Sequence, residues 1–195
     1  MSEEQTQEEV TKELWQRAAN NEGTIRADAY VALGRMAFDQ GKFKESLAFC
    51  ETAKEIFEQE DEGEYQREIF DVNMGISKNY EKLERSQEAA QAMGIAIEAA
   101  KVIEIEELDD LLRDQGRYWF SAGQYENSIA CHQEAIVQTQ MFLREESFGI
   151  DYFNIGMGLF ELGRYQESID AYLKSRAAFK ASDCLLYTSP SPRDS

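Results

Sequence analysis

Hydrophobic residues recur at three- and four-residue spacing along most of the chain, which is the pattern of α-helices that bury one face. The pattern is interrupted by short turns, three of which carry Gly41, Gly123 or Gly163. Glycine readily takes the left-handed backbone conformation with which many helices end. The spacing therefore predicts an all-α fold in which helices are joined by tight turns.

Four of the predicted helix segments resemble one another and reveal an internal repeat. They are GKFKESLAFCETAKEI from Gly41, LERSQEAAQAMGIAIEAA from Leu83, GQYENSIACHQEAIVQ from Gly123 and GRYQESIDAYLKSRAA from Gly163. A second shared motif precedes three of them, as LGRMAF at Leu33, QGRYWF at Gln115 and IGMGLF at Ile155. A repeat made of two helical motifs predicts helical hairpins. We expect four hairpins, over about residues 27–62, 66–104, 107–146 and 147–182.

Three glycines lie in the middle of the first helix of a hairpin, where glycine costs about 1 kcal/mol relative to alanine. A packing role would explain why the cost is accepted at equivalent positions. We expect each glycine to face a serine of the second helix, so that the two helices approach closely. The expected pairs are Gly34 with Ser46, Gly116 with Ser128, and Gly156 with Ser168.

The repeated positions resemble those of the tetratricopeptide repeat family. The family pattern places a large apolar residue, Leu-Gly, an aromatic residue, Gly-x-Tyr and an alanine along one hairpin. The first copy matches it with Tyr30, Leu33, Gly34, Phe38, Gly41, Phe43, Ser46 and Ala53. The resemblance covers about residues 27 to 182 and implies a right-handed α-solenoid of antiparallel helical hairpins.

Two departures from the family pattern have one physical cause. The turns at Gly41, Glu84, Gly123 and Gly163 are 43, 39 and 40 residues apart, against about 34 in the family. The family also often places proline at the end of the second helix, and none stands there in this chain. Because proline stops helices, its absence lets each second helix extend. The second copy is degenerate, with Ser77 and Glu84 where glycine is usual.

In this family the first helices of successive hairpins line a concave groove, in which an extended or helical segment of a partner protein binds. The resemblance implies that four basic and four apolar residues face this groove. The basic residues are Arg35, Lys78, Arg113 and Arg117, and the apolar residues are Phe120, Phe153, Met157 and Phe160. The apolar residues could form an anchor pocket for a partner side chain, or they could be surface that a missing next repeat would bury. The basic residues favour an acidic peptide as the partner. The alternative is that they pair with acidic neighbours one helical turn away, as Arg35 could with Asp39.

The charge of the chain excludes several classes of partner. It has 38 acidic and 20 basic residues and a formal net charge of −18, which disfavours nucleic acid and anionic membrane surfaces. The N-terminus MSEEQTQEEV lacks the basic start of a secretory signal, and no apolar stretch reaches the roughly 18 residues of a membrane span. The three scattered cysteines give no disulfide framework. We therefore expect a cytoplasmic protein.

No motif indicates catalysis. Phosphate-binding, nucleophile-elbow and zinc-protease signatures are absent from the sequence. His132 follows Cys131, but neighbouring residues on a helix point about 100° apart and cannot form a nucleophile and base pair. We expect His132, and Cys50 at the matching position of the first copy, to be structural. The sequence predicts no enzyme, no cofactor and no metal site.

Three functions remain open. The first is a protein-interaction scaffold that binds a peptide segment in the concave groove. The second is a sensor or regulatory module of a longer protein, whose effector domain this chain lacks. The third is a self-assembling structural repeat protein. Partner identity and oligomeric state stay undetermined.

The two ends differ from the repeats. Residues 1–26 predict an acidic segment and a helix that caps the first hairpin and ends at NNEG. Residues 183–195 predict a non-native, disordered tail, because CLLYTSPSPRDS resembles a translated sequencing adaptor. On this interpretation the chain is a truncated fragment, cut near Ser182. Ala171 and Phe179 would then expose apolar surface that a capping helix normally covers.

Overall fold

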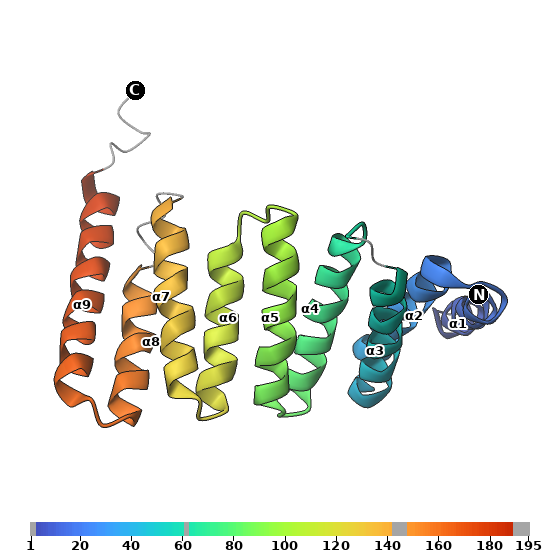
Figure 1. Ribbon diagram of the computed structural model, residues 1–195, viewed down its shortest axis with the longest axis horizontal. Helices are drawn as coiled ribbons and strands as arrows, with labels where there is room; N and C mark the ends of the chain where they lie inside the picture. The colour runs from blue at the N-terminus through green and yellow to red at the C-terminus, as the bar shows by residue number, and fades with distance from the viewer. Residues whose placement is uncertain (1–2, 61–62, 142–147, 189–195) are drawn as a thin grey trace. The chain divides into compact units, whose positions relative to one another are not determined.

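The computed structural model describes residues 3–60, 63–141 and 148–188, and these residues form nine α-helices and no strand (Figure 1). The helices belong to two compact units, Met1–Glu106 (unit 1) and Glu107–Ser195 (unit 2). Unit 1 contains α1 (Glu3–Asn20), α2 (Gly23–Asp39), α3 (Phe43–Glu60), α4 (Gln66–Lys82) and α5 (Ser86–Val102). Unit 2 contains α6 (Leu108–Ser121), α7 (Tyr125–Met141), α8 (Phe148–Glu161) and α9 (Tyr165–Thr188).

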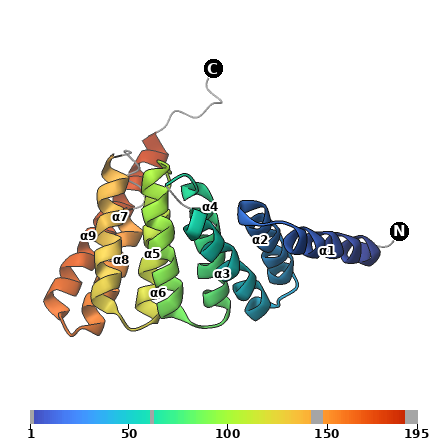
Figure 2. The same ribbon diagram turned by 45° about the vertical axis from the view of Figure 1, so that its right-hand side comes forward.

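The helices pack as consecutive hairpins, as the two views show (Figures 1 and 2). The pairs in contact are α2 with α3, α4 with α5, α6 with α7 and α8 with α9. The predicted all-α solenoid of helical hairpins is therefore confirmed. No helix in the described part of the chain is long and apolar enough to cross a membrane.

The core of unit 1 is built from the apolar faces that the helical spacing predicts. Leu47, Ala53 and Phe57 of α3 pack with Ile69, Val72 and Ile76 of α4. The helix α1 lies on α2 and contacts α3 through Trp15, whose ring meets Phe49 edge-on at 5.6 Å. The N-terminal residues thus cover apolar surface of the first hairpin, and α1 ends at Asn20, within the predicted NNEG stop.

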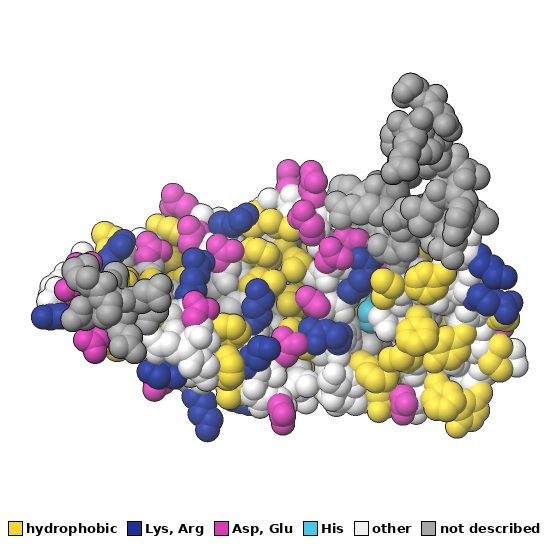
Figure 3. Space-filling model, turned by 180° about the vertical axis from the view of Figure 1, so that it is seen from behind, with side chains coloured by type: hydrophobic (Ala, Val, Ile, Leu, Met, Phe, Trp, Pro, Cys, Tyr) yellow, Lys and Arg dark blue, Asp and Glu magenta, His cyan; other side chains and the backbone are white. Residues whose placement is uncertain are grey.

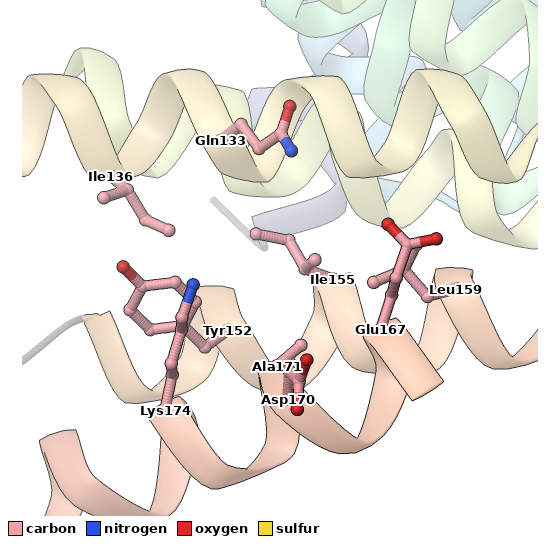
Figure 4. A pocket seen from close by; sticks show the side chains of 9 residues that line it. All are labelled: Gln133, Ile136, Tyr152, Ile155, Leu159, Glu167, Asp170, Ala171 and Lys174. Atoms are coloured by element: carbon pink, nitrogen blue, oxygen red, sulfur yellow. The ribbon is translucent and has the colours of Figure 1, made fainter. Parts of the chain in front are cut away.

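The core of unit 2 is a cluster of Ile129, Ile136, Ile155, Leu159 and Ala171. Four members of this cluster, Ile136, Ile155, Leu159 and Ala171, line a pocket of about 390 Å³ (Figure 4). Glu167, Asp170 and Lys174 are among the other residues that line it. The prediction that Ala171 is exposed is wrong, since its small side chain is 6% exposed and packs in this cluster. Phe179 is 42% exposed, as predicted.

The helix α9 is longer than the sequence predicts. Disorder was expected from Asp183, but the helix continues to Thr188. Residues 183–188 contain neither glycine nor proline, so nothing in them stops the helix. The residue before a proline is disfavoured in helical conformation, and Ser189 precedes Pro190. Residues 189–195 of the predicted tail lie outside the described residues.

The turn inside each hairpin has the same backbone geometry. Lys42 donates its N–H to the carbonyl of Ala37 at 2.8 Å, and Arg85 donates to Tyr80 at 2.9 Å. These hydrogen bonds close the Schellman motif that ends many helices, and the motif requires a residue with positive φ. Gly41, Gly123 and Gly163 supply it, whereas the second hairpin places Glu84 there with φ of +59°.

We predict that Glu84→Gly stabilises unit 1. The left-handed conformation costs a residue with a side chain about 1–2 kcal/mol, and the greater flexibility of glycine in the unfolded chain offsets about half of this gain. The expected increase in unfolding free energy is about 0.5–1 kcal/mol. Urea unfolding followed by the fluorescence of Trp15, with Trp119→Phe in both proteins, would measure it. Gly41→Ala should have the opposite effect, and a Glu84→Gly protein of lower stability would contradict the prediction.

Candidate functional site

Unit 1 contains a groove between α2 and α4, with α3 as its floor. Its volume is about 500 Å³. The lining residues come from the first helices of two successive hairpins, which is where the sequence placed a partner-binding groove. They include Arg35, Phe38, Asp39, Phe70, Asp71, Met74 and Lys78 on the walls and Ser46 and Cys50 on the floor.

Two of the predicted basic residues, Arg35 and Lys78, share this groove. Both side chains are exposed, and within the described residues neither forms a hydrogen bond or an ion pair. The expected pairing of Arg35 with Asp39 is therefore not made. Asp71, on the opposite wall, lies 3.9 Å from Arg67. Two positively charged side chains thus face the groove, and within the described residues neither contacts a carboxylate.

The floor of the groove exists because two glycines carry no side chain. A Cβ atom on Gly34 would lie 3.0 Å from the sulfur of Cys50, and one on Gly75 would lie 3.5 Å from it. Burial, opposed in part by a hydrogen bond from Ser46, raises the pKa of the Cys50 thiol to about 11. The thiol is therefore protonated at neutral pH, and it acts as a small apolar group.

The predicted pairing of mid-helix glycine with serine is confirmed at Gly156, whose carbonyl accepts a hydrogen bond from Ser168 Oγ at 2.7 Å, but the side chain that a Cβ on the glycine would meet is a different one. A Cβ on Gly116 would meet His132 at 2.8 Å, and one on Gly156 would meet Tyr172 at 2.7 Å. The residue that faces each glycine thus lies sixteen positions later, one turn beyond the serine, and is Cys50, His132 or Tyr172. The reason is that a helical side chain leans toward the N-terminus of its own helix.

Unit 2 contains a groove at the same position of the repeat, between α6 and α8 with α7 as the floor. Its volume is about 260 Å³. Eight of its lining residues correspond in repeat register to lining residues of the unit 1 groove. The corresponding pairs are Arg35 and Arg117, Phe38 and Phe120, Asp39 and Ser121, Ser46 and Ser128, Cys50 and His132, Asp71 and Ile150, Gly75 and Asn154, and Lys78 and Met157.

A buried polar cluster lies against the groove of unit 2. The five N–H donors of Arg113 reach four side chains, through contacts with Asp151 at 3.0 Å, Asp109 at 3.0 Å, Asp110 at 2.7 Å and Thr139 at 2.8 Å. These residues come from α6, α7 and α8, so the cluster ties the third hairpin to the first helix of the fourth. His132 joins it, since its Nδ1 lies 3.0 Å from Asp151 Oδ1.

The charges in this cluster stabilise one another. The Arg113 side chain is 13% exposed and that of Asp151 is 0% exposed. Burial by itself would lower the pKa of Arg113, but the hydrogen bonds and negative charges of Asp151 and Asp109 raise it above its usual value. The guanidinium group therefore stays charged, and it supplies the compensation without which buried carboxylates are costly.

The predicted site residues of unit 2 consequently have different environments. Arg113 is engaged by the cluster and is not free to bind a partner, whereas Arg117, Phe120 and Met157 line the groove. Arg117 contacts Asp114 at 3.4 Å and lies over the ring of Tyr118. Phe153 and Phe160 stand outside the groove, exposed on α8, and their rings meet Tyr172 and Tyr165 of α9. Figure 3 shows one face of the protein on which hydrophobic side chains are exposed.

Little in the sequence predicts the buried cluster. Asp109 and Arg113 are four residues apart on one helix, which is a recognisable ion-pair spacing. Asp151 lies 38 residues beyond Arg113, and no local pattern marks it as a partner. His132 was expected to be structural, and the structure places it in this structural network.

One buried polar atom of the unit 2 groove has no partner. Ser128 is 1% exposed, and its Oγ forms no hydrogen bond within the described residues. The matching serines are satisfied, because Ser46 accepts from Asn79 Nδ2 at 2.9 Å and Ser168 donates to the carbonyl of Gly156 at 2.7 Å. A lone buried hydroxyl costs about 1–3 kcal/mol, so Ser128 is a departure from the repeat.

We predict that Arg113→Ala strongly destabilises unit 2, because it leaves Asp151 and Asp109 buried without their cation. The expected loss of unfolding free energy is about 3–5 kcal/mol. Arg117→Ala is the matched control, since it removes an exposed arginine four residues later, and should cost less than about 1 kcal/mol. Urea unfolding followed by Trp119 fluorescence, with Trp15→Phe in both proteins, would report on unit 2. Equal losses in the two variants would contradict the structural role of Arg113.

A second prediction concerns the unpartnered hydroxyl. Ser128→Ala should leave the unfolding free energy unchanged or raise it by up to about 1 kcal/mol, because a desolvated group is removed and no hydrogen bond is lost. Ser168→Ala removes a hydrogen bond in the equivalent position and should lower the free energy by about 1 kcal/mol. The same fluorescence experiment would compare them. A larger loss for Ser128→Ala than for Ser168→Ala would show that Ser128 has a partner.

Comparison with known proteins agrees with this architecture. A family model described as tetratricopeptide repeat matches residues 26–60, which cover most of the first hairpin. A search of curated proteins gave no match.

Solved structures show the same fold at low sequence identity. A putative kinesin light chain of Podosopora anserina with nearly identical TPR-like repeats has a TM-score of 0.67 and 16% identity, over 90% of this chain and 88% of that chain. The apo form of RapI has a TM-score of 0.69 and 14% identity, over 92% of this chain and 48% of that chain. A STAND signal transduction ATPase with a tetratricopeptide repeat sensor, PH0952 from Pyrococcus horikoshii, has a TM-score of 0.61 and 20% identity, over 90% of this chain and 28% of that chain. The chain thus spans less than half the length of two of these proteins.

Proposed function

Because the chain has the fold of tetratricopeptide-repeat proteins and matches that family over residues 26–60, we propose that it is a non-enzymatic interaction scaffold whose unit 1 groove binds an acidic segment of a partner protein. Arg35 and Lys78 hold carboxylates of that segment, and the apolar side chains between them hold its hydrophobic residues. The observation that carries the proposal is that both cations face one groove without an ion pair among the described residues.

Electrostatics supports an acidic partner. The chain has a net charge of −18, so unpaired basic side chains in a hollow are the places where it attracts negative charge. Arginine presents a planar group that can hold a carboxylate with two parallel hydrogen bonds. Asp39 and Asp71 also line the groove, and they favour partners whose carboxylates are placed to meet the two cations.

The two ion pairs alone would give weak binding. Exposed pairs contribute about 0.2–1 kcal/mol each, so together they change affinity by about two- to thirtyfold. The rest must come from apolar burial, for which Phe38, Phe70 and Met74 line the same groove. Aromatic residues and methionine are enriched at the centres of protein interfaces. The partner segment therefore carries hydrophobic residues beside its acidic ones.

A peptide array screened with the intact protein would test this function. Arg35→Glu/Lys78→Glu should weaken binding to acidic–hydrophobic peptides by about tenfold or more, since attraction becomes repulsion. The wild-type binding should also weaken with added salt, because exposed charges are screened.

The matched control reverses two exposed lysines of unit 1 outside the groove, Lys12→Glu/Lys44→Glu, with the same change in net charge. It should change affinity by less than about twofold at physiological salt, where the Debye length is about 8 Å. Equal effects of the two double variants, or unchanged binding in both, would refute the proposed groove.

The second candidate function is that of a regulatory module in a longer protein. It is supported by the coverage of RapI and PH0952, of which this chain matches 48% and 28%. The complete coding sequence of the source gene would test it, and a reading frame without a further domain would exclude it.

A further inference from the structure

The unit 1 groove continues into a second hollow toward the N-terminal ends of α2 and α4. These two helices run in the same direction, because α3 leads back between them. The second hollow has a volume of about 560 Å³, and Arg35 and Asp71 line both it and the groove. Its other lining residues are Val10 and Leu14 of α1, Asp28, Val31, Ala32 and Met36 of α2, Phe57 of α3, and Glu68 and Val72 of α4. A partner segment bound in the groove can therefore extend into this hollow.

Most of the lining of the second hollow is apolar. Seven of its eleven lining residues have apolar side chains. Phe57 and Val72 are buried in the core of unit 1. Val10, in contrast, is 42% exposed, and Leu14 and Val31 are only half-buried. These partly exposed side chains gain free energy when an apolar group of a partner covers them.

The second hollow is more acidic than the groove. The groove is lined by two cations and two carboxylates, whereas the second hollow has one cation, Arg35, and three carboxylates. One of them, Asp71, lies 3.9 Å from Arg67. The carboxylates of the other two, Asp28 and Glu68, form no hydrogen bond or ion pair within the described residues. The second hollow therefore combines apolar surface with an excess of negative charge.

A lysine or arginine side chain matches this combination. Its methylene groups cover apolar surface while its charged end stays in water. Asp28 is exposed and Glu68 is half-buried, so the charged end can approach both without losing its hydration. A purely apolar side chain would leave these two carboxylates without a partner, and an acidic side chain would be repelled by them.

We propose that the partner segment bound in the unit 1 groove carries a lysine or arginine whose side chain occupies the second hollow, with its charged end near Asp28 and Glu68. The inference rests on the proposed function, because it concerns the same segment whose carboxylates meet Arg35 and Lys78. It adds a basic residue to the acidic and hydrophobic ones, so the segment is charged oppositely at its two ends.

The geometry of the two helices gives the spacing of these charges. Asp28 precedes Arg35 by seven residues on α2, which is about 10 Å at 1.5 Å per residue. Glu68 precedes Lys78 by ten residues on α4, which is about 15 Å. An extended segment advances about 3.3 Å per residue. The basic residue therefore lies about three to five residues from the acidic residues of an extended partner segment.

Binding of synthetic peptides to the full chain, measured by fluorescence anisotropy, tests this spacing. Each peptide contains a Glu-Glu pair, one Leu and one Phe, and a single Lys placed one to eight residues from the pair on either side. A matched peptide has Gln in place of Lys. On one side of the pair, we expect Lys to strengthen binding about threefold or more at separations of three to five residues, because it meets two exposed carboxylates. The preference should be smaller at shorter and longer separations.

Two double variants test which carboxylates cause the preference. Asp28→Asn/Glu68→Gln should abolish the preference for Lys and change the affinity for the Gln peptides less than about twofold. The matched control is Glu45→Gln/Glu55→Gln, which makes the same change in net charge at two exposed residues of α3 that line neither hollow. It should keep the preference.

Three results would overturn the inference. They are equal binding of Lys and Gln peptides at every separation, a preference without a maximum at three to five residues, and a preference that both double variants retain alike. The second result would mean that the net charge of −18 attracts lysine without a defined site. The peptide comparison on the wild-type protein decides the matter even if a variant fails to fold.

A third set of peptides separates this inference from the proposed function. It keeps Lys, Leu and Phe and has Gln-Gln in place of Glu-Glu. Loss of the Lys preference with retained dependence on Arg35 and Lys78 would remove this inference alone. If binding does not depend on Arg35 and Lys78, but the third set still needs Asp28 and Glu68, the acidic partner is wrong and the site for a basic side chain is kept. Failure of every peptide to bind would remove both.

Discussion

The close approach of two helices at a glycine is the constraint on which both grooves depend. Gly34 and Gly116 allow the second helix of each hairpin to come near enough for Cys50 or His132 to contact the backbone of the first. The residue opposite the glycine therefore lies on the floor of the groove between this helix and the first helix of the next hairpin. Any side chain at these glycines would push the two helices apart or displace the floor residue. The same contact thus holds the hairpin together and determines which side chain forms the floor of the groove.

The two grooves show how one repeated position can acquire different chemistry. In unit 1 the floor is a protonated thiol, and the walls carry two unpaired cations. In unit 2 a histidine replaces the thiol, apolar residues replace Asp71 and Lys78, and the volume falls from about 500 to about 260 Å³. Backbone packing is retained because each substitution lies on the groove lining. The fold accordingly constrains where a partner binds and leaves the choice of partner to a few side chains.

The sequence could predict the hairpins because their signals are local. Turn glycines, apolar spacing and mid-helix glycines all act within one hairpin, so the helix pairs and the stop at NNEG followed from the pattern. The alignment of Glu84 with the turn glycines also indicated its positive φ. By contrast, the sequence alone did not distinguish Arg35 from Arg113, because both are basic residues that it assigned to the groove. Only the fold shows that Asp151, 38 residues away, engages one of them. Ser128 is a similar case. In unit 1 Asn79 donates to the matching serine, Ser46, and the residue of unit 2 that corresponds to Asn79 is Gly158, which has no side chain.

The cluster around Arg113 also bears on how unit 2 opens. Repeat proteins often lose their terminal hairpin first, because each hairpin contacts only its neighbours. Separation of α8 from α6 and α7 would strip Asp151 of both Arg113 and His132 and expose the charges of three helices at once. The separated charged groups of the cluster are not stabilised until water hydrates all of them. A partial opening at this junction therefore has a high free energy. We therefore expect the third and fourth hairpins to exchange with solvent as one cooperative block.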